Sequence, residues 1–148
     1  MKRRVILFLL WCCVLTPLSA QDGLQVAALF DGRYRKCPDV IEVMLQGKKV
    51  KPYGLTLFRS LTLPAHTADV SYVESLVKSD GARAGDKEVG MKGRRLYYGF
   101  YGLPSRNNLN RYIFYRNNSL QAGKKPVLTI IYMEGTATIA ELKARFGK

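Results

Sequence analysis

The sequence predicts an α+β fold, in which an antiparallel sheet of about five strands carries two or three helices packed on one face. Runs with apolar residues at every second position occur beside runs in which they recur every three or four positions. The strand-like runs follow one another through short turns, which requires antiparallel pairing. The helix-like runs are amphipathic, so each must bury its apolar stripe against the sheet.

The first part of the expected domain contains one short helix and two strands. Residues 24–30 are apolar and contain alanines, which favours one or two turns of helix. Apolar and polar residues alternate at 40–46, and again at 55–63 after a turn at 47–49. In the second run, the leucines at positions 55, 57, 61 and 63 share one face, and Arg59 interrupts that face. The interruption predicts a kink or an edge position at Arg59.

The hydrophobic period then changes to that of a helix. Apolar residues recur at helical spacing over residues 70–77, with Thr67 or Asp69 available as the N-cap and Gly81 beyond the end. The next stretch, residues 80–93, is rich in glycine and charge and poor in apolar residues. It predicts a mobile loop with room for a short strand.

Three strand signals and a helix complete the chain. Residues 96–103 and 111–116 are dense in aromatic side chains, and residues 127–133 are β-branched and apolar. Thr138 and Glu141 have the spacing of a capping box, which predicts the start of a last amphipathic helix.

The N-terminus has the three-part pattern of a secretory signal peptide. A basic start at residues 2–4 precedes a mostly apolar run at 5–15, a helix-breaking Pro17 and a small residue, Ala20. The apolar run is shorter than the roughly 20 residues that a membrane-spanning helix needs. We therefore expect cleavage after Ala20, which leaves residues 21–148 as one domain in the periplasm or outside the cell, without a transmembrane segment.

Charge and cysteine content indicate the surroundings of this mature chain. The full sequence has a formal net charge of +13, and loss of the three basic residues at positions 2–4 lowers it to +10. Cys12 and Cys13 also lie in the signal, so Cys37 alone is left and no internal disulfide is possible. This content favours a bacterial envelope protein over a disulfide-stapled secreted module. The charge favours weak attraction to polyanions.

Residue types that carry catalytic chemistry are sparse. The mature chain has one histidine, His66, and one cysteine, Cys37, too few for the ligand cluster of a zinc site. We expect no metal and no cofactor, and no catalytic residue stands out. The alternative is a small envelope hydrolase or other enzyme, which would use a thiol–imidazole pair of Cys37 and His66 or carboxylates that the sequence does not single out.

Basic and aromatic residues interleave in the last third of the sequence. Aromatic side chains on a sheet with flanking arginines bind sugars, peptides or polyanions through stacking and charge. The segment lacks the glycine that the RNA-recognition strand signature places after its basic residue, and export separates the protein from cytoplasmic RNA. We therefore expect no nucleic-acid partner. The candidate ligand-binding side chains are Arg94, Arg95, Tyr97, Tyr101, Arg111 and Tyr115. This interpretation requires that they share an exposed face.

Three features together resemble small exported proteins of unknown function from Bacteroidetes. They are a signal that ends at Ala20 and Gln21, the run GKKVKPY at residues 47–53 leading into LTLFRSL at 55–61, and the final hairpin with the Thr138-capped helix. The resemblance covers most of the mature chain, and its motifs are structural rather than catalytic. It implies a periplasmic or secreted location and no known activity.

The sequence as a whole predicts an exported, non-enzymatic domain that binds a ligand or associates with the cell envelope. An envelope protein, a glycan or a polyanion is the expected partner. Two alternatives stay open at this stage, the small hydrolase described above and a purely structural or inhibitory partner of another envelope protein. An exposed apolar patch would favour the last.

Overall fold

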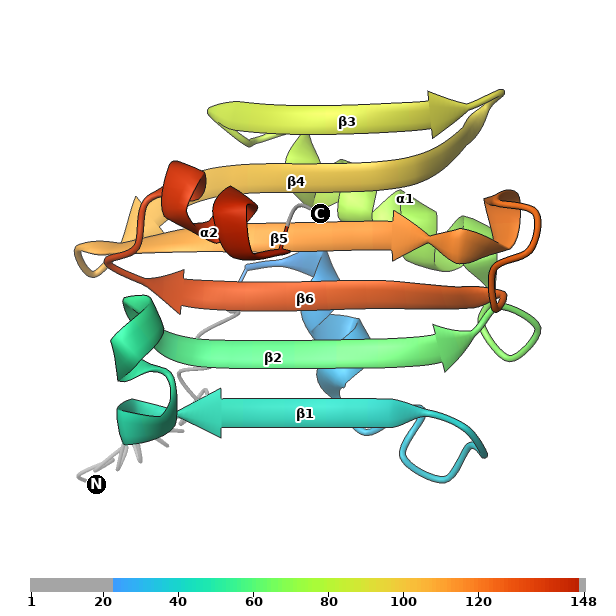
Figure 1. Cartoon of the computed structure of the whole chain (residues 1–148), viewed down its shortest axis with the longest axis horizontal. Coiled ribbons are helices and arrows are strands. Elements are labelled where there is room, and N and C mark those ends of the chain that lie inside the picture. The colour runs from blue at the N-terminus through green and yellow to red at the C-terminus, as the bar shows by residue number, and fades with distance from the viewer. Residues whose placement is uncertain (1–22, 147–148) are drawn as a thin grey trace, which may run out of the picture.

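Residues 23–146 are described by the computed structural model, and they form one six-stranded antiparallel sheet in the order β1-β2-β6-β5-β4-β3 (Figure 1). The strands are β1 (Ile41–Gln46), β2 (Leu55–Pro64), β3 (Asp86–Lys92), β4 (Arg95–Arg106), β5 (Leu109–Asn117) and β6 (Val127–Gly135). The α-helices are α1 (Val70–Gly81) and α2 (Ile139–Phe146), and the short 3-10 helices are η1 (Gln25–Phe30), η2 (Gly47–Lys49), η3 (Lys51–Tyr53) and η4 (Asn118–Leu120). Within residues 23–146, no helix is both long and apolar enough to cross a membrane.

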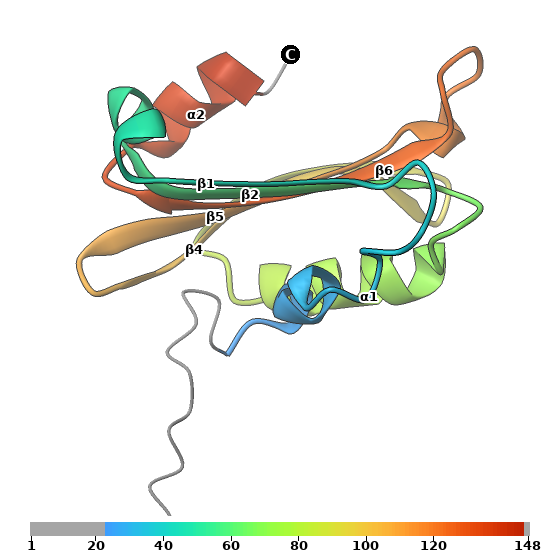
Figure 2. The same ribbon diagram turned by 90° about the horizontal axis from the view of Figure 1, so that it is seen from below.

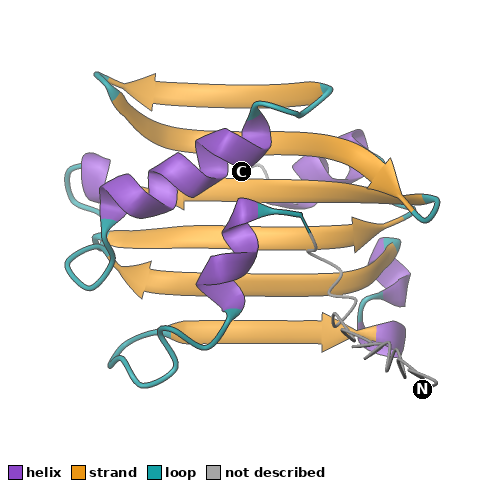
Figure 3. Cartoon of the chain, turned by 180° about the vertical axis from the view of Figure 1, so that it is seen from behind, coloured by secondary structure: helices purple, strands orange, loops and turns teal. Residues whose placement is uncertain are grey.

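The sheet dominates the molecule, which corrects the predicted α+β class to a largely β-sheet fold. There are six strands rather than five, and the two short α-helices lie on opposite faces rather than on one (Figure 2). Helices α1 and η1 cross one face, here called the α1 face (Figure 3), and α2 lies over one end of the other, the α2 face. The sixth strand is β3, in the stretch 80–93 that the sequence predicts as a mobile loop with room for a short strand. It lies at an edge with most of its side chains exposed, so no apolar period reveals it in the sequence.

The core of the α1 face fills the space between the sheet and the two helices. Val73 and Val77 of α1 and Val26 of η1 are fully buried there. Asp80, near the end of α1 and itself buried, accepts hydrogen bonds from the backbone N–H groups of Gln25 at 2.8 Å and Val26 at 2.9 Å. Its carboxylate thereby satisfies the N-terminus of η1 and fixes η1 against α1.

Arg59 belongs to this face and marks neither a kink nor an edge. Strand β2 is an interior strand, and its pairing with β1 and β6 continues through Arg59. The guanidinium carbon lies 4.8 Å from the ring centroid of Phe30, and one Nη donates to the Phe30 carbonyl at 2.9 Å. The same side chain pairs with Glu42 at 3.4 Å. Arg59 therefore covers the end of η1, and its charge is compensated by Glu42 and the contacts with Phe30.

A β-bulge at the start of β2 divides its leucines between the two faces. The register with β6 advances two residues on β2, from Leu55 to Leu57, while β6 advances one. Leu57, Leu61 and Leu63 accordingly pack on the α1 face, whereas Leu55 joins the core of the α2 face. The prediction that all four leucines share one face is wrong at Leu55.

The expected capping box forms and sets α2 against the α2 face. The backbone N–H of Thr138 donates to the Glu141 carboxylate at 2.9 Å, and the Glu141 N–H donates to Thr138 Oγ1 at 3.3 Å. One turn later, Leu142 is fully buried on the sheet, and Lys143 pairs with Glu88 of β3 at 2.9 Å. Helix α2 covers only one end of this face, which leaves the rest of it open (Figure 2).

Candidate functional site

Three of the six side chains proposed from the sequence are buried. Tyr101 is 3% exposed and Tyr115 is 0% exposed, and both belong to the core of the α1 face. Burial raises the pKa of both phenols. Arg111 is also buried, and its Nε donates to the Pro104 carbonyl at 3.0 Å. These residues support the fold and present no surface to a ligand.

The other three side chains lie near the turn between β3 and β4. Arg94 is exposed in that turn. Arg95 reaches across to α1, where it pairs with Glu74 at 3.5 Å. Tyr97 is half-buried, and its hydroxyl donates to Gln121 Oε1 at 2.9 Å. The structure therefore does not bring the six residues onto one exposed face, and the surface proposed from the sequence is not formed.

The aromatic residues on the α2 face are those at alternate strand positions to Tyr101 and Tyr115. Tyr98 of β4 and Phe114 of β5 lie on the α2 face, with ring centroids 5.6 Å apart. The guanidinium carbon of Arg116 lies 5.6 Å from each of these ring centroids. Successive strand residues point to opposite faces, so Tyr101 and Tyr115 lie on the α1 face, beneath the helix.

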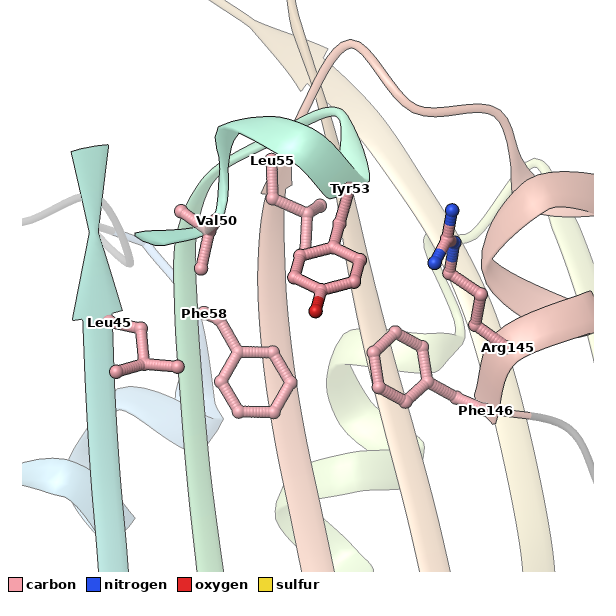
Figure 4. A pocket seen from close by; sticks show the side chains of 7 residues that line it. All are labelled: Leu45, Val50, Tyr53, Leu55, Phe58, Arg145 and Phe146. Atoms are coloured by element: carbon pink, nitrogen blue, oxygen red, sulfur yellow. The ribbon is translucent and has the colours of Figure 1, made fainter. Parts of the chain in front are cut away.

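A pocket of about 430 Å³ lies on the α2 face, where the sheet meets η3 and the end of α2 (Figure 4). Two stretches that are distant in the sequence build it: residues 45–58, which run from β1 through η2 and η3 into β2, and the end of α2. Its lining side chains are Leu45, Val50, Tyr53, Leu55, Phe58, Arg145 and Phe146. The volume is within the range of small-molecule sites, roughly 300–1,000 Å³, and most of the lining is apolar as in such sites.

Aromatic rings form the sides of this pocket. The rings of Phe58 and Phe146 stack with centroids 5.9 Å apart, which joins the sheet to the last described turn of α2. Tyr53, on η3, is 46% exposed and lies at the opening. The guanidinium carbon of Arg145 is 4.9 Å from the Tyr53 ring centroid. This stacking holds the cation at the rim of an apolar cavity.

Arg145 is the single charged residue among the seven that line the pocket. No carboxylate in the described part of the chain forms an ion pair with it. Glu141, one helical turn earlier, lines a second hollow that shares Tyr53 and Arg145, but its carboxylate accepts the Thr138 N–H. The rim of the pocket is therefore cationic.

Comparison with protein families places most of the chain in one group. A model of a family of unknown function, DUF6108, matches residues 13–146. The chain belongs to the DUF6108 family. No curated protein and no solved structure matches it. All seven lining residues of the pocket fall within the matched range, so the DUF6108 match spans every segment that builds the site.

The pocket in this DUF6108 chain could not be predicted from the sequence, because Arg145 and Phe146, which complete it, are distant from the other five lining residues at 45–58. Leu45 and Phe58 look like ordinary members of alternating strands, and Arg145 and Phe146 like the end of an amphipathic helix. The sequence signal for the pocket is Tyr53, because an aromatic residue stands there in a short basic turn with no expected core around it.

The two residues named for the hydrolase alternative differ in their surroundings. Cys37 is half-buried and packs against the core of the α1 face, while His66 is exposed. Within residues 23–146, no hydrogen bond joins their side chains, and no group of three or more potential ligands is placed to hold a metal ion.

Proposed function

We propose that this protein is an exported, non-enzymatic binding protein of the bacterial envelope, and that it binds an anionic amphiphile in the pocket of the α2 face. The observation that carries the proposal is an apolar, aromatic-sided cavity of about 430 Å³ with one cation, Arg145, at its rim. Such a site recognises a molecule with an apolar body and an anionic end.

Burial of the apolar body supplies the affinity. The pocket exposes apolar surface of Leu45, Phe58 and Phe146 to water, and a hydrocarbon chain or ring that covers it gains roughly 25 cal/mol for each Å² removed from water. Arg145 is already held over Tyr53, so an anionic group that pairs with it requires little further ordering of the side chain. Charge thus selects among molecules that the cavity admits.

The lining favours binding over catalysis. Tyr53 and Arg145 are the ionisable residues of the pocket, and the other five are apolar. The seven lining residues include no histidine, cysteine, serine or carboxylate, the side chains that usually act as nucleophile or general base. The hydrophobic walls therefore position a ligand and leave its bonds unchanged.

Binding can be measured with three probes that share one tail. Trp11, in the expected signal, is the single tryptophan of the sequence, so Tyr53→Trp gives a mature chain with one tryptophan, at the pocket. Titration with dodecanoate should change its fluorescence saturably, and dodecanol and dodecyltrimethylammonium should bind more weakly. In this background Arg145→Gln should weaken dodecanoate about fivefold, the effect of a ~1 kcal/mol exposed ion pair, and leave dodecanol unchanged.

Two further variants separate the pocket from the general charge of the protein. Phe146→Ala should weaken all three probes by about tenfold because it removes one aromatic side of the cavity. Arg94→Gln removes an exposed arginine outside the pocket and should leave binding unchanged. Equal affinity for the three head groups, or equal effects of Arg145→Gln and Arg94→Gln, would contradict the anionic ligand. Absence of saturable binding would contradict the binding function itself.

Export is supported by the three-part pattern of residues 1–20, which lie outside the described residues. Expression in a Gram-negative host followed by cell fractionation tests it. We expect the protein in the periplasmic or extracellular fraction, with an N-terminus that begins at Gln21. An uncleaved chain in the cytoplasm would rule this part out and leave the pocket proposal standing.

A further inference from the structure

The two edge strands of the sheet differ in how they are protected from pairing. Strand β3 carries charges at Asp86, Lys87, Glu88 and Lys92, and its register with β4 is broken by an irregularity after Gly90. Charges and bulges are the usual devices that keep an edge strand from pairing with another chain. On this edge both are present.

Strand β1, at the opposite edge, lacks these devices. Its sequence, IEVMLQ, contains no lysine and no proline, and its six residues pair with β2 in an unbroken register. Ile41 is 60% exposed and Met44 is 53% exposed. The outer side of β1 therefore presents a regular row of backbone donors and acceptors, with apolar side chains on either face of the sheet.

We propose that β1 pairs antiparallel with β1 of a second copy of this chain, with Val43 opposite the partner's Val43. A two-fold axis perpendicular to the sheet keeps each face on its own side, so opposed residues must belong to the same face. Leu45 packs in the core of the α2 face, and Ile41 and Val43 share its parity. In this register Ile41 lies opposite the partner's Leu45, so apolar side chains meet along the α2 face of the new strand pair.

Charge agrees with self-pairing. The single charged residue of β1, Glu42, is held by Arg59 of its own chain at 3.4 Å, so the new pair brings no free like charges together. Asp39 precedes the strand and Lys48 follows it, and both are exposed. Antiparallel pairing brings the Asp39 end of each β1 to the Lys48 end of its partner, so opposite charges occur at both ends of the interface.

Sedimentation velocity of the mature chain at physiological ionic strength, over a series of concentrations, tests the proposal. We expect a monomer–dimer equilibrium. Val43→Lys and Val43→Glu should each weaken the dimer about tenfold or more, because each places two like charges opposite one another. An equimolar mixture of these two variants should restore the dimer, since lysine then faces glutamate. Val89→Lys, on β3, is the matched control, because Val89 is 43% exposed and should leave the dimer unchanged.

Ile41→Lys provides a variant at a more exposed position, should a charge at Val43 disturb folding as judged by circular dichroism. It should also weaken the dimer, because a lysine would face the partner's Leu45. Each copy carries a net charge of +10 after signal removal, so added salt should screen the repulsion between copies and raise dimer affinity. If β1 instead paired with an acidic peptide, added salt would weaken the binding. A monomer at every concentration, a dimer unaffected by the Val43 variants, or no rescue in the mixture would each overturn the proposal.

Discussion

At the scale of single residues, Glu74 of α1 shows how a buried carboxylate is kept charged. It is 4% exposed, Lys78 Nζ lies 2.6 Å from one of its oxygens, and Arg95 lies 3.5 Å from the other. Burial acts to raise the pKa of Glu74, but hydrogen bonds from Lys78, Arg95 and the Leu96 backbone outweigh it, and its pKa is lowered. Arg95, proposed from the sequence as a ligand-binding residue, instead stabilises this carboxylate.

A lowered pKa links Glu74 to the acid stability of the protein. The Glu74 carboxylate binds a proton less readily in the folded state than in the unfolded chain. The stabilisation is therefore present above the unfolded pKa of about 4.5 and is lost as the pH falls through the folded-state pKa. Glu74→Gln should lower the free energy of unfolding at pH 7 by about 1–3 kcal/mol. It should also make stability less dependent on pH below about 5. Urea unfolding at a series of pH values measures both effects.

Glu88→Gln is the matched control for this prediction. Glu88 also pairs with a lysine, Lys143 at 2.9 Å, but its side chain is 58% exposed. Solvent screens such a pair, so its loss should change stability by less than about 1 kcal/mol. Equal losses from the two substitutions would show that burial does not determine the contribution of Glu74.

At the scale of the elements, the contact between α1 and β4 depends on the absence of two side chains. The ring of Tyr101 lies between Gly81 at the end of α1 and Gly99 of β4, and a Cβ added at either glycine would overlap it. Alanine normally stabilises a helix relative to glycine by about 1 kcal/mol. Here overpacking reverses the sign, and Gly81→Ala should lower the free energy of unfolding by about 1–3 kcal/mol.

Chemical denaturation of two further variants checks this cause. Ser79→Ala, at an exposed position of the same helix, should leave stability within about 0.5 kcal/mol of the wild type. In the Tyr101→Leu background, Gly81→Ala should lose most of its effect because the ring is no longer there. A persistent loss in that background would point to the helix end rather than to the ring.

The elements themselves could largely be predicted from the sequence, but not the faces they present. Apolar period indicates β1, β2 and α1, aromatic and β-branched content indicates β4, β5 and β6, and a capping box indicates α2. For β3 the sequence predicts only a loop with room for a short strand, because an exposed edge strand needs no apolar face. The alternation of faces along a strand is broken at the β-bulges. One separates Leu55 from Leu57, and another lies where Met91 pairs with Leu96 after Gly90 pairs with Tyr98, which leaves Tyr97 as the extra residue. A single inserted residue exchanges the two faces of a strand, and nothing local in the sequence announces it.

At the scale of the whole molecule, the sheet has two unequal covers. Helix α1 is twelve residues long and, with η1, buries the larger core, whereas α2 has eight residues and one fully buried side chain, Leu142. The pocket is formed where the smaller cover ends, between Phe146 and the η2–η3 connection. The candidate site thus depends on the cover with the smaller buried core, which local unfolding should reach before the larger one.

This inequality predicts that α2 detaches without unfolding the sheet. Leu→Ala at a rigid buried site costs about 2–5 kcal/mol, but for Leu142 the loss is limited to the free energy that holds α2 in place. In native-state hydrogen exchange, Leu142→Ala should speed exchange of the α2 amides and leave those of β5 and β6 close to wild type. Dodecanoate binding should fall with it because Phe146 leaves the pocket. Val77→Ala, under the larger cover, should instead lower protection throughout the sheet. If Leu142→Ala lowered all protection equally, the two covers would form a single cooperative unit, and the pocket would be as stable as the core.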